Sequence, residues 1–226
     1  MGDRAAILAE RLAATRTRLG DSGATLVVVT KFFPASDVRI LRDLGVTDIG
    51  ENRDQEASAK VAELDAAGER PERVHFIGQI QSNKAASIAR YADVVQSVDR
   101  EKIVSALEKG ARAADRRLEV LLQVDLDGDA AGRGGVAPSA LPALAERAGA
   151  SDVLTLRGLM AVAPLGWEPE RAFGRLAELH EQVMRDHPGA TWRSAGMSGD
   201  LEAALAHGAT HVRVGSAILG DRPRAG

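Results

Sequence analysis

The feature that most constrains this chain is an eightfold alternation of short apolar runs with helical stretches. The apolar runs are rich in β-branched residues and predict parallel strands at Leu26–Thr30, Asp48–Gly50, Val74–Gly78, Asp93–Val98, Leu118–Leu126, Leu156–Ala163, Trp192–Met197 and His211–Leu219. Each predicted strand except the last is followed by a predicted helix. Apolar residues at i, i+3 and i+4 mark such helices at Ser36–Leu44, Arg53–Ala67 and Arg171–Met184, and another, Arg4–Leu19, precedes the first strand.

This alternation indicates an α/β fold. Strands that alternate with helices form parallel βαβ units, and eight units are the number that closes a (β/α)8 TIM barrel. A doubly wound open sheet is the alternative, because periodicity alone does not separate the two. No low-complexity linker divides the chain, and Asp127–Ser139 is expected to be a long flexible loop. We therefore expect a barrel with an extra N-terminal helix, as a single domain over residues 1–226.

Composition excludes several classes of protein. The chain has no cysteine, so it forms no disulfide, no cysteine-ligated zinc site and no thiol nucleophile. Its net charge of −3 and 3% aromatic content argue against a nucleic-acid partner. No apolar run approaches the roughly 18–20 residues that span a bilayer, and the N-terminus lacks the apolar region of a signal peptide. We expect a cytoplasmic protein without a membrane partner.

Two segments begin like ligand-binding motifs and then depart from them. Asp125-Leu-Asp-Gly-Asp opens like a calcium loop, but Ala130 stands where the loop needs glycine and Val136 where it needs a bidentate glutamate. Gly215–Gly220 opens like a phosphate-binding P-loop, but Asp221 follows where lysine is required. The histidines show no metal-binding spacing. We expect no metal site.

Two candidate site residues follow the first two predicted strands. Lys31 comes directly after an apolar run, and barrel active sites lie at the carboxyl ends of the strands. An amine held there against apolar walls favours its neutral form, which forms a Schiff base with an aldehyde; a solvated terminal lysine is the alternative. Asn52 ends the second strand, where it either faces the barrel mouth or caps the following helix.

Glycine-rich loops follow the last two predicted strands. One is Ser194-Ala-Gly-Met-Ser-Gly-Asp200, which contains Met197, and the other is Arg213-Val-Gly215-Ser216. Loops after the seventh and eighth strands of barrels often bind phosphate, because glycine lets backbone amides approach the oxygens. Two ordinary turns are the alternative. Together with Lys31, these loops indicate a barrel that binds pyridoxal phosphate.

The sequence resembles the pyridoxal phosphate homeostasis proteins, which are similar to the barrel domain of alanine racemase. The resemblance rests on Val-Val-Thr-Lys31, Ile-Gly-Glu-Asn52, His75-Phe-Ile-Gly78, Gln81-Ser-Asn-Lys84, Leu-Arg157-Gly-Leu-Met160, Ser194–Asp200 and Val212–Gly220. These stretches cover nearly the whole chain in order. The resemblance implies a protein that stores and delivers pyridoxal 5'-phosphate (PLP) inside the cell.

The resemblance also implies roles for single residues. Lys31 would hold PLP as a Schiff base, and Asn52 would lie beside its ring. Ser194, Met197 and the backbone at Gly215 and Ser216 would hold the phosphate end. Arg213 would approach the pyridine nitrogen, which keeps that nitrogen unprotonated and restrains the ring's chemistry. The chain departs from the family at Gln79, Arg133, Ala195 and Leu219, which leaves loop contacts and a second ligand site at the Asp127–Ser139 loop open.

Catalytic turnover would require a second acid–base group. Racemases similar to this barrel use a tyrosine opposite the lysine, whereas the single tyrosine of this chain, Tyr91, falls late in a predicted helix, at the wrong end of its βα unit. We therefore expect a PLP carrier, not an enzyme, that acts as a monomer and transiently contacts PLP-dependent apoenzymes. A PLP-dependent racemase is the alternative, and so is a phosphosugar enzyme that uses Lys31 without a cofactor.

Overall fold

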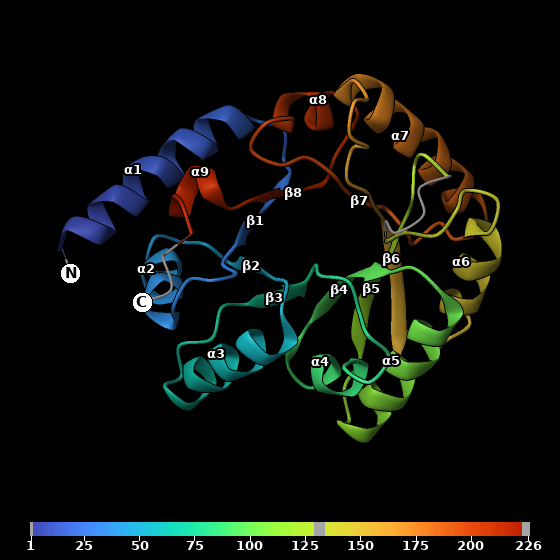
Figure 1. Ribbon diagram of the computed structural model, residues 1–226, viewed down its shortest axis with the longest axis horizontal. Helices are drawn as coiled ribbons and strands as arrows, with labels where there is room; N and C mark the ends of the chain where they lie inside the picture. Colours follow the sequence, from blue (N-terminus) through green and yellow to red (C-terminus); the bar gives the residue numbers. More distant parts are fainter. Residues whose placement is uncertain (1, 129–133, 223–226) are drawn as a thin grey trace.

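Eight parallel strands close into a barrel in the computed structural model, which describes residues 2–128 and 134–222 (Figure 1). They follow the order of the chain around the ring, and β1 pairs with β8. The strands are β1 (Thr25–Val29), β2 (Asp48–Glu51), β3 (Arg73–Phe76), β4 (Val94–Val98), β5 (Leu118–Gln123), β6 (Leu154–Met160), β7 (Trp192–Ser194) and β8 (His211–Val214). The predicted (β/α)8 barrel is confirmed, and the open-sheet alternative is wrong.

Helices surround this ring of strands (Figure 1). They are α1 (Gly2–Leu19), α2 (Ala35–Asp43), α3 (Asp54–Ala66), α4 (Ala85–Tyr91), α5 (Glu101–Ala113), α6 (Leu141–Gly149), α7 (Pro169–Asp186), α8 (Leu201–Ala206) and α9 (Ser216–Leu219). The extra N-terminal helix is confirmed as α1, which packs against α2, α8 and α9. Leu8 and Leu12 on its inner face are buried, and their burial stabilises this docking.

The end of the chain differs from its prediction. The apolar run His211–Leu219 was expected to be one strand with no helix after it, but β8 ends at Val214 and α9 follows. Ile218 and Leu219 of α9 are buried, so the apolar residues of the run continue past the end of the strand. A helix of four residues is too short to show a helical period in the sequence. The predicted strands at Leu118–Leu126, Leu156–Ala163 and Trp192–Met197 also end earlier than expected.

The segment after β5 is partly attached to the barrel. The amide of Val136 donates to Gln123 O at 2.8 Å, and the Gln123 side chain donates to Gly134 O at 2.8 Å. Of the loop predicted at Asp127–Ser139, residues 129–133 lie outside the described residues. The part that returns to the barrel is therefore held against β5 by backbone and side-chain hydrogen bonds.

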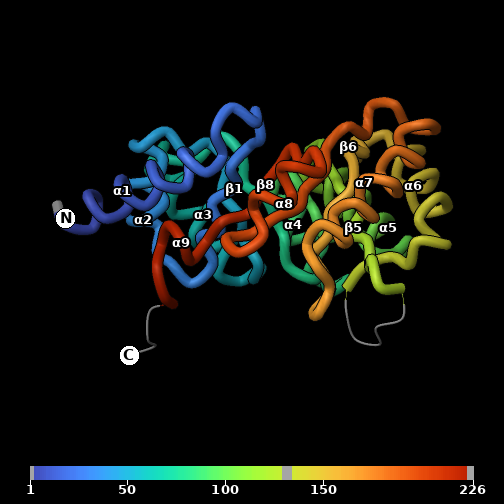
Figure 2. The backbone as a smooth tube through the Cα atoms, turned by 90° about the horizontal axis from the view of Figure 1, so that it is seen from above, coloured from blue at the N-terminus to red at the C-terminus, as the bar shows by residue number. Residues whose placement is uncertain are grey.

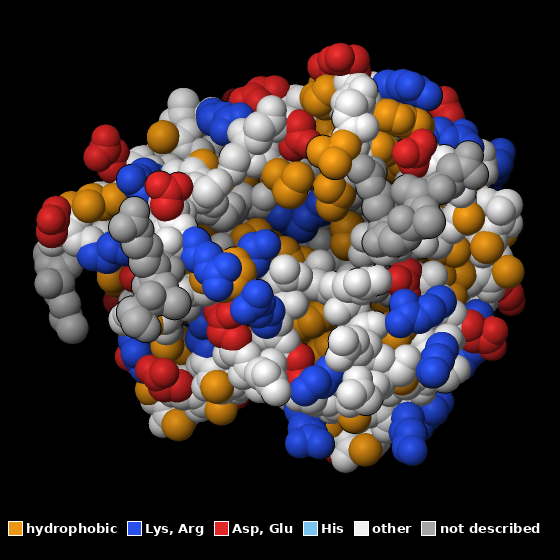
Figure 3. Space-filling view, in the orientation of Figure 1, with side chains coloured by type: hydrophobic (Ala, Val, Ile, Leu, Met, Phe, Trp, Pro, Cys, Tyr) orange, Lys and Arg blue, Asp and Glu red, His pale blue; other side chains and the backbone are white. Residues whose placement is uncertain are grey.

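Figure 2 shows the barrel from above, with α9 and the loop after β5 on the same side of the molecule. This side is the carboxyl end of the strands, and it is the face seen in Figures 1 and 3. Lys and Arg side chains surround a hollow near the middle of that face (Figure 3). Within residues 2–128 and 134–222, no helix is long and apolar enough to cross a membrane.

Candidate functional site

The predicted site residues meet at the carboxyl ends of four adjacent strands. Lys31 follows β1, Asn52 follows β2, Ser194 ends β7, and Arg213 lies in β8 just before Gly215. They meet because β1 pairs with β8 on one side and with β2 on the other. Residues from the two ends of the chain are thus neighbours only in the closed barrel.

The backbone around Lys31 turns sharply out of β1. Phe32 has a φ of 71°, in the left-handed region, and its amide donates to Glu56 Oε1 at 2.5 Å. Lys31 itself is only partly buried, with Nζ 5.8 Å from the centroid of the Phe32 ring. The guanidinium of Arg53 lies 4.9 Å from the same ring. The sequence predicted apolar walls for this amine, but its surroundings combine one aromatic ring with charged groups.

A buried ion cluster lies behind this turn. Lys60 Nζ is 2.8 Å from Thr30 O, 2.7 Å from Glu51 Oε1 and 3.3 Å from Glu56 Oε1. The Thr30 hydroxyl also donates to Glu51 Oε1, at 2.6 Å. Burial raises the pKa of Glu51, and this effect outweighs the opposing influence of Lys60 and Thr30. Sequence reasoning missed the cluster, because a lysine in the middle of a charged helix looks like a solvent-facing residue.

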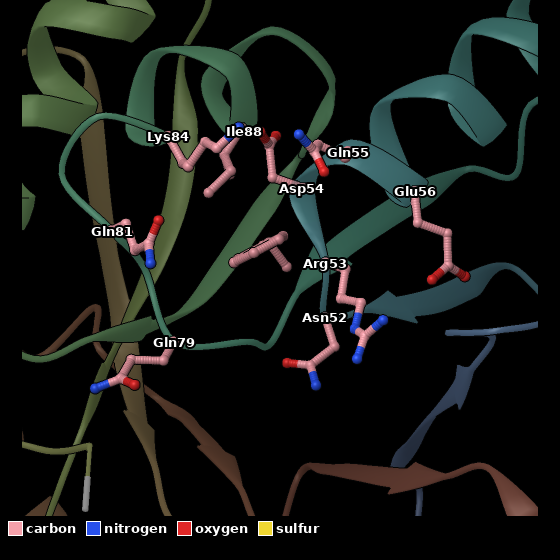
Figure 4. Close-up of a pocket in the computed structure, with 10 residues that line it drawn as sticks. Asn52, Arg53, Asp54, Gln55, Glu56, Gln79, Gln81, Lys84 and Ile88 are labelled. Atoms are coloured by element: carbon pink, nitrogen blue, oxygen red, sulfur yellow. Dashed lines mark ion pairs between the residues drawn. The ribbon is translucent and has the colours of Figure 1, made fainter. Parts of the chain in front are cut away.

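Asn52 is positioned by a glycine on the next strand's loop. A Cβ on Gly78 would lie 2.1 Å from both the backbone oxygen and Oδ1 of Asn52, so only glycine allows this contact. Asn52 also lines a cavity of about 740 Å³ between the loops after β2 and β3 (Figure 4). Gln79, Gln81 and Lys84 lie on the opposite side of this cavity in the close-up. The polar run after the third predicted strand therefore does line the barrel mouth.

Ser194 and Arg213 lie in the interior of the barrel. Arg213 Nη1 donates to Ser194 Oγ at 2.6 Å, and Nη2 donates to Ala161 O at 2.8 Å. Ser194 is fully buried and donates to Gln96 Oε1 at 2.7 Å. Burial lowers the pKa of Arg213 to about 10, which leaves it a cation at neutral pH. The phosphate contact predicted for Ser194 stays a prediction, and the hydroxyl is engaged with these two partners.

The remaining predicted phosphate residues lie at the rim. A Cβ on Gly215 would lie 3.2 Å from Val29 O, so β8 and β1 approach closely there. Ser216 is exposed at the start of α9. Met197 is 41% exposed, and its amide donates to Asp200 Oδ1 at 2.6 Å. These three positions share one edge of the mouth, beside the end of β1.

Tyr91 lies where the sequence predicted, at the end of α4, and it is buried. Burial raises its pKa, with Asp54 and Glu51 adding to the effect. Its hydroxyl, Asp54 Oδ1 and Glu51 Oε2 are buried without a hydrogen-bond partner among the described residues. Tyr91 is thus an enclosed phenol beside acidic groups.

Comparison with known proteins decides the family. Residues 4–223 match the family model described as alanine racemase, N-terminal domain. A pyridoxal phosphate homeostasis protein of Corynebacterium glutamicum is 47% identical over 212 residues, which cover 91% of this chain and 93% of the relative. One of Mycobacterium tuberculosis is 44% identical over 245 residues, covering 97% and 95%. The chain belongs to the pyridoxal phosphate homeostasis proteins, within the alanine racemase N-terminal domain family.

A solved homologue extends this assignment to the fold. PipY of Synechococcus elongatus, solved with PLP bound, is 34% identical, has a TM-score of 0.85, and covers 94% of this chain with all of its own. The fold of this chain is therefore shared with PipY along nearly the whole length of both chains. The resemblance stated from the sequence motifs is confirmed.

Proposed function

We propose that this chain binds PLP at the carboxyl end of its barrel and serves PLP homeostasis by storing and delivering the cofactor, without a dedicated turnover reaction. The observation that carries the proposal is the closure of the barrel between β1 and β8. It pairs the strand that precedes Lys31 with the strand that carries Arg213 and is followed by Gly215. The names of the relatives and the PLP-bound state of PipY support the proposal.

The residues present fit this cofactor. Lys31 Nζ is the amine that would hold it, and Asn52 would flank its ring. Gly215, where a side chain would meet Val29 O, would offer backbone amides to the phosphate end, together with Met197 and Ser216. Ser194 would donate to the phosphate only by turning its hydroxyl away from Gln96. When bound, PLP supplies an aldehyde that joins amines reversibly and a ring that accepts electron density.

Arg213 favours storage over catalysis. It is a cation fixed by two hydrogen bonds, and it would face the pyridine nitrogen as a donor. A nitrogen that accepts from a cation stays unprotonated, so the ring withdraws electrons less strongly. Tyr91, the residue type that would supply an opposing base, is buried at the end of α4. Both features support a carrier role, with a racemase as the second possibility that the experiments below separate.

The decisive experiment is reduction with borohydride followed by intact mass and peptide mapping. The protein mixed with PLP should gain the mass of one reduced pyridoxal phosphate on Lys31, and Lys31→Ala should gain none there. Lys84→Ala is the matched control, since it removes another lysine of the mouth and should label like the wild type. Equal labelling of wild type and Lys31→Ala would refute the site.

Turnover is tested separately by hydrogen exchange. The PLP-loaded protein in deuterium oxide should leave the α-hydrogen of each common amino acid in place. Steady exchange with any of them would favour the racemase. Labelling by a sugar phosphate but not by PLP in the borohydride experiment would instead favour the phosphosugar enzyme.

The partner side of the proposal concerns delivery. We propose that the chain acts as a monomer in the cytoplasm and passes PLP to apoenzymes during transient contacts. Sedimentation of the loaded protein should give the mass of one chain. Activation of a PLP-dependent apoenzyme by the loaded protein should be faster than by the PLP that the same preparation releases through a dialysis membrane.

A further inference from the structure

A single chain of buried hydrogen bonds runs through the barrel from Arg213 to Asp48. Arg213 donates to Ser194, and Ser194 donates to Gln96 Oε1. Gln96 Nε2 is 2.8 Å from His75 Nδ1, and His75 Nε2 is 2.8 Å from Asp48 Oδ1. The members are nearly or fully buried. Gln96 lies on β4 and Ser194 on β7, which do not pair, so the bond between them crosses the barrel interior.

The carboxylate at one end sets the direction of this chain. Burial raises the pKa of Asp48, but hydrogen bonds from His75 and Thr47 outweigh it, so the pKa lies below its ordinary value and Asp48 is ionised. A carboxylate only accepts, so His75 donates to Asp48 from Nε2. An imidazole with this one proton has Nδ1 as an acceptor. Nδ1 is then satisfied by the amide nitrogen of Gln96.

The same logic reaches Arg213. With its nitrogen turned to His75, Gln96 presents its oxygen to Ser194, and the one hydroxyl proton of Ser194 points to that oxygen. Ser194 therefore offers only lone pairs to Arg213, which can only donate. Each bond in the chain then has one direction. A buried network whose bonds are directed in this way holds its members in a single arrangement.

We propose that Asp48, His75 and Gln96 are positioning residues that hold Ser194 as an acceptor and so fix the guanidinium of Arg213 at the barrel mouth. The functional value of this positioning rests on the proposed function, in which Arg213 faces the pyridine nitrogen of PLP. The positioning itself is a property of the protein without cofactor.

The first test measures proton positions in the cofactor-free, full-length protein. Nitrogen-15 NMR should find the His75 proton on Nε2. Hydrogens of the Arg213 guanidinium should exchange slowly with solvent. A His75 proton on Nδ1 alone would reverse the direction of the chain and overturn the proposal, and this measurement needs no variant.

The second test breaks the chain in its middle. Gln96→Met removes the bonds to His75 and Ser194 at similar volume and frees the Ser194 hydroxyl to rotate. Arg213 exchange should become faster by up to about tenfold, because a lost hydrogen bond between uncharged groups is worth up to about that factor. Gln123→Met is the matched control on β5, where the amide nitrogen bonds to Gly134 O. Equal Arg213 exchange in Gln96→Met and the wild type would overturn the proposal.

A conservative variant separates positioning from simple packing. In Gln96→Glu the side chain still accepts from Ser194, so Arg213 exchange should stay slow. The other carboxylate oxygen faces His75 Nδ1, so His75 should acquire a proton on that nitrogen. Fast Arg213 exchange in Gln96→Glu would contradict the directional argument.

Loading with PLP connects this inference to function. The loaded Gln96→Met protein should lose PLP faster than Gln123→Met and the wild type. If the wild type fails to bind PLP while Arg213 exchange behaves as expected, the proposed function fails and the positioning stands. If PLP binds and Gln96→Met leaves Arg213 exchange unchanged, the positioning proposal fails and the proposed function stands.

Discussion

Polar groups on the two sides of the barrel mouth differ in burial and in hydrogen bonding. On the β7–β8 side, Arg213 and Ser194 are buried, and each makes two hydrogen bonds. On the β1–β2 side, Lys31 is partly exposed, and Glu51 keeps one buried oxygen without a partner among the described residues. The first side is built to hold a group in one orientation. The second leaves an amine accessible, which is what exchange of a covalently held cofactor requires.

The two networks also differ in charge. The chain from Asp48 to Arg213 has one charge at each end, and polar side chains separate the two charges. The cluster behind Lys31 joins Lys60 to Glu51 and Glu56, with little solvent. Ion clusters of this kind are fragile when one member is removed, because the others remain buried and unpaired. The predictions below test this contrast, beginning with the largest effect.

Lys60→Met should lower the free energy of unfolding by about 3–5 kcal/mol, because it leaves Glu51 buried beside Glu56 without a cation. Arg175→Met is the matched control: its guanidinium lies 2.9 Å from Glu178 and both side chains are exposed, so its loss should cost about 1 kcal/mol or less. Urea unfolding measures both. Equal losses would mean that the cluster contributes no more than a surface pair.

Asp48→Asn should lower the free energy of unfolding by about 1.5–3 kcal/mol at pH 7, since the bond from His75 loses its charged acceptor. The folded pKa of Asp48 lies below its ordinary value of 3.8, so its stabilisation is present above that value and disappears as pH falls through the folded pKa. The difference between variant and wild type should therefore shrink in acid. A difference that grows on acidification would contradict the sign.

Glu51 should change the stability with pH in the opposite direction to Asp48. Its pKa is raised on folding, so the folded state is penalised as pH rises through the interval between its ordinary value of 4.5 and the raised value. Glu51→Gln should remove that part of the pH dependence, which is read from urea unfolding across the acidic range.

Gly78→Ala should lower the free energy of unfolding by about 1–3 kcal/mol, because the new methyl group meets the backbone and side-chain oxygens of Asn52. Gly189→Ala is the matched control, since a Cβ there meets nothing within 4 Å. Urea unfolding compares the two. An unchanged free energy of unfolding in Gly78→Ala would show that Asn52 moves freely, whereas Arg213 is held in place.

The smallest effect belongs to a surface pair outside both networks. Arg18 bonds Glu202 at 2.7 Å, but the glutamate side chain is 62% exposed. Arg18→Ala should lower the free energy of unfolding by about 0.5 kcal/mol or less, because solvent and salt screen the pair. The loss should vanish at high salt in thermal unfolding. A larger, salt-resistant loss would point to packing of α1 instead.

Much of the fold could be predicted from the sequence because it follows from local patterns of apolar and polar residues. Valine-rich runs such as Val27–Val29 are buried on both faces, and their regular alternation with amphipathic helices predicts parallel βαβ units. The count of eight units favoured the barrel, whereas closure itself is seen only in the structure. Boundaries were less predictable where a short helix carries the composition of a strand, as at Ser216–Leu219. The position of Lys31 at a strand end followed from charge alone.

The sequence by itself determined which residue types lie at the barrel mouth, namely a lysine after one strand and glycine-rich loops after two others. Only the tertiary structure decided which buried polar groups meet. Ser194 and Gln96 are 98 residues apart and touch because the closed barrel sets β4 opposite β7. Lys60 is buried because its helix turns that side chain toward Thr30. A hydrogen bond depends on distance and direction between atoms, and for residues far apart in the chain these are fixed only when the barrel closes.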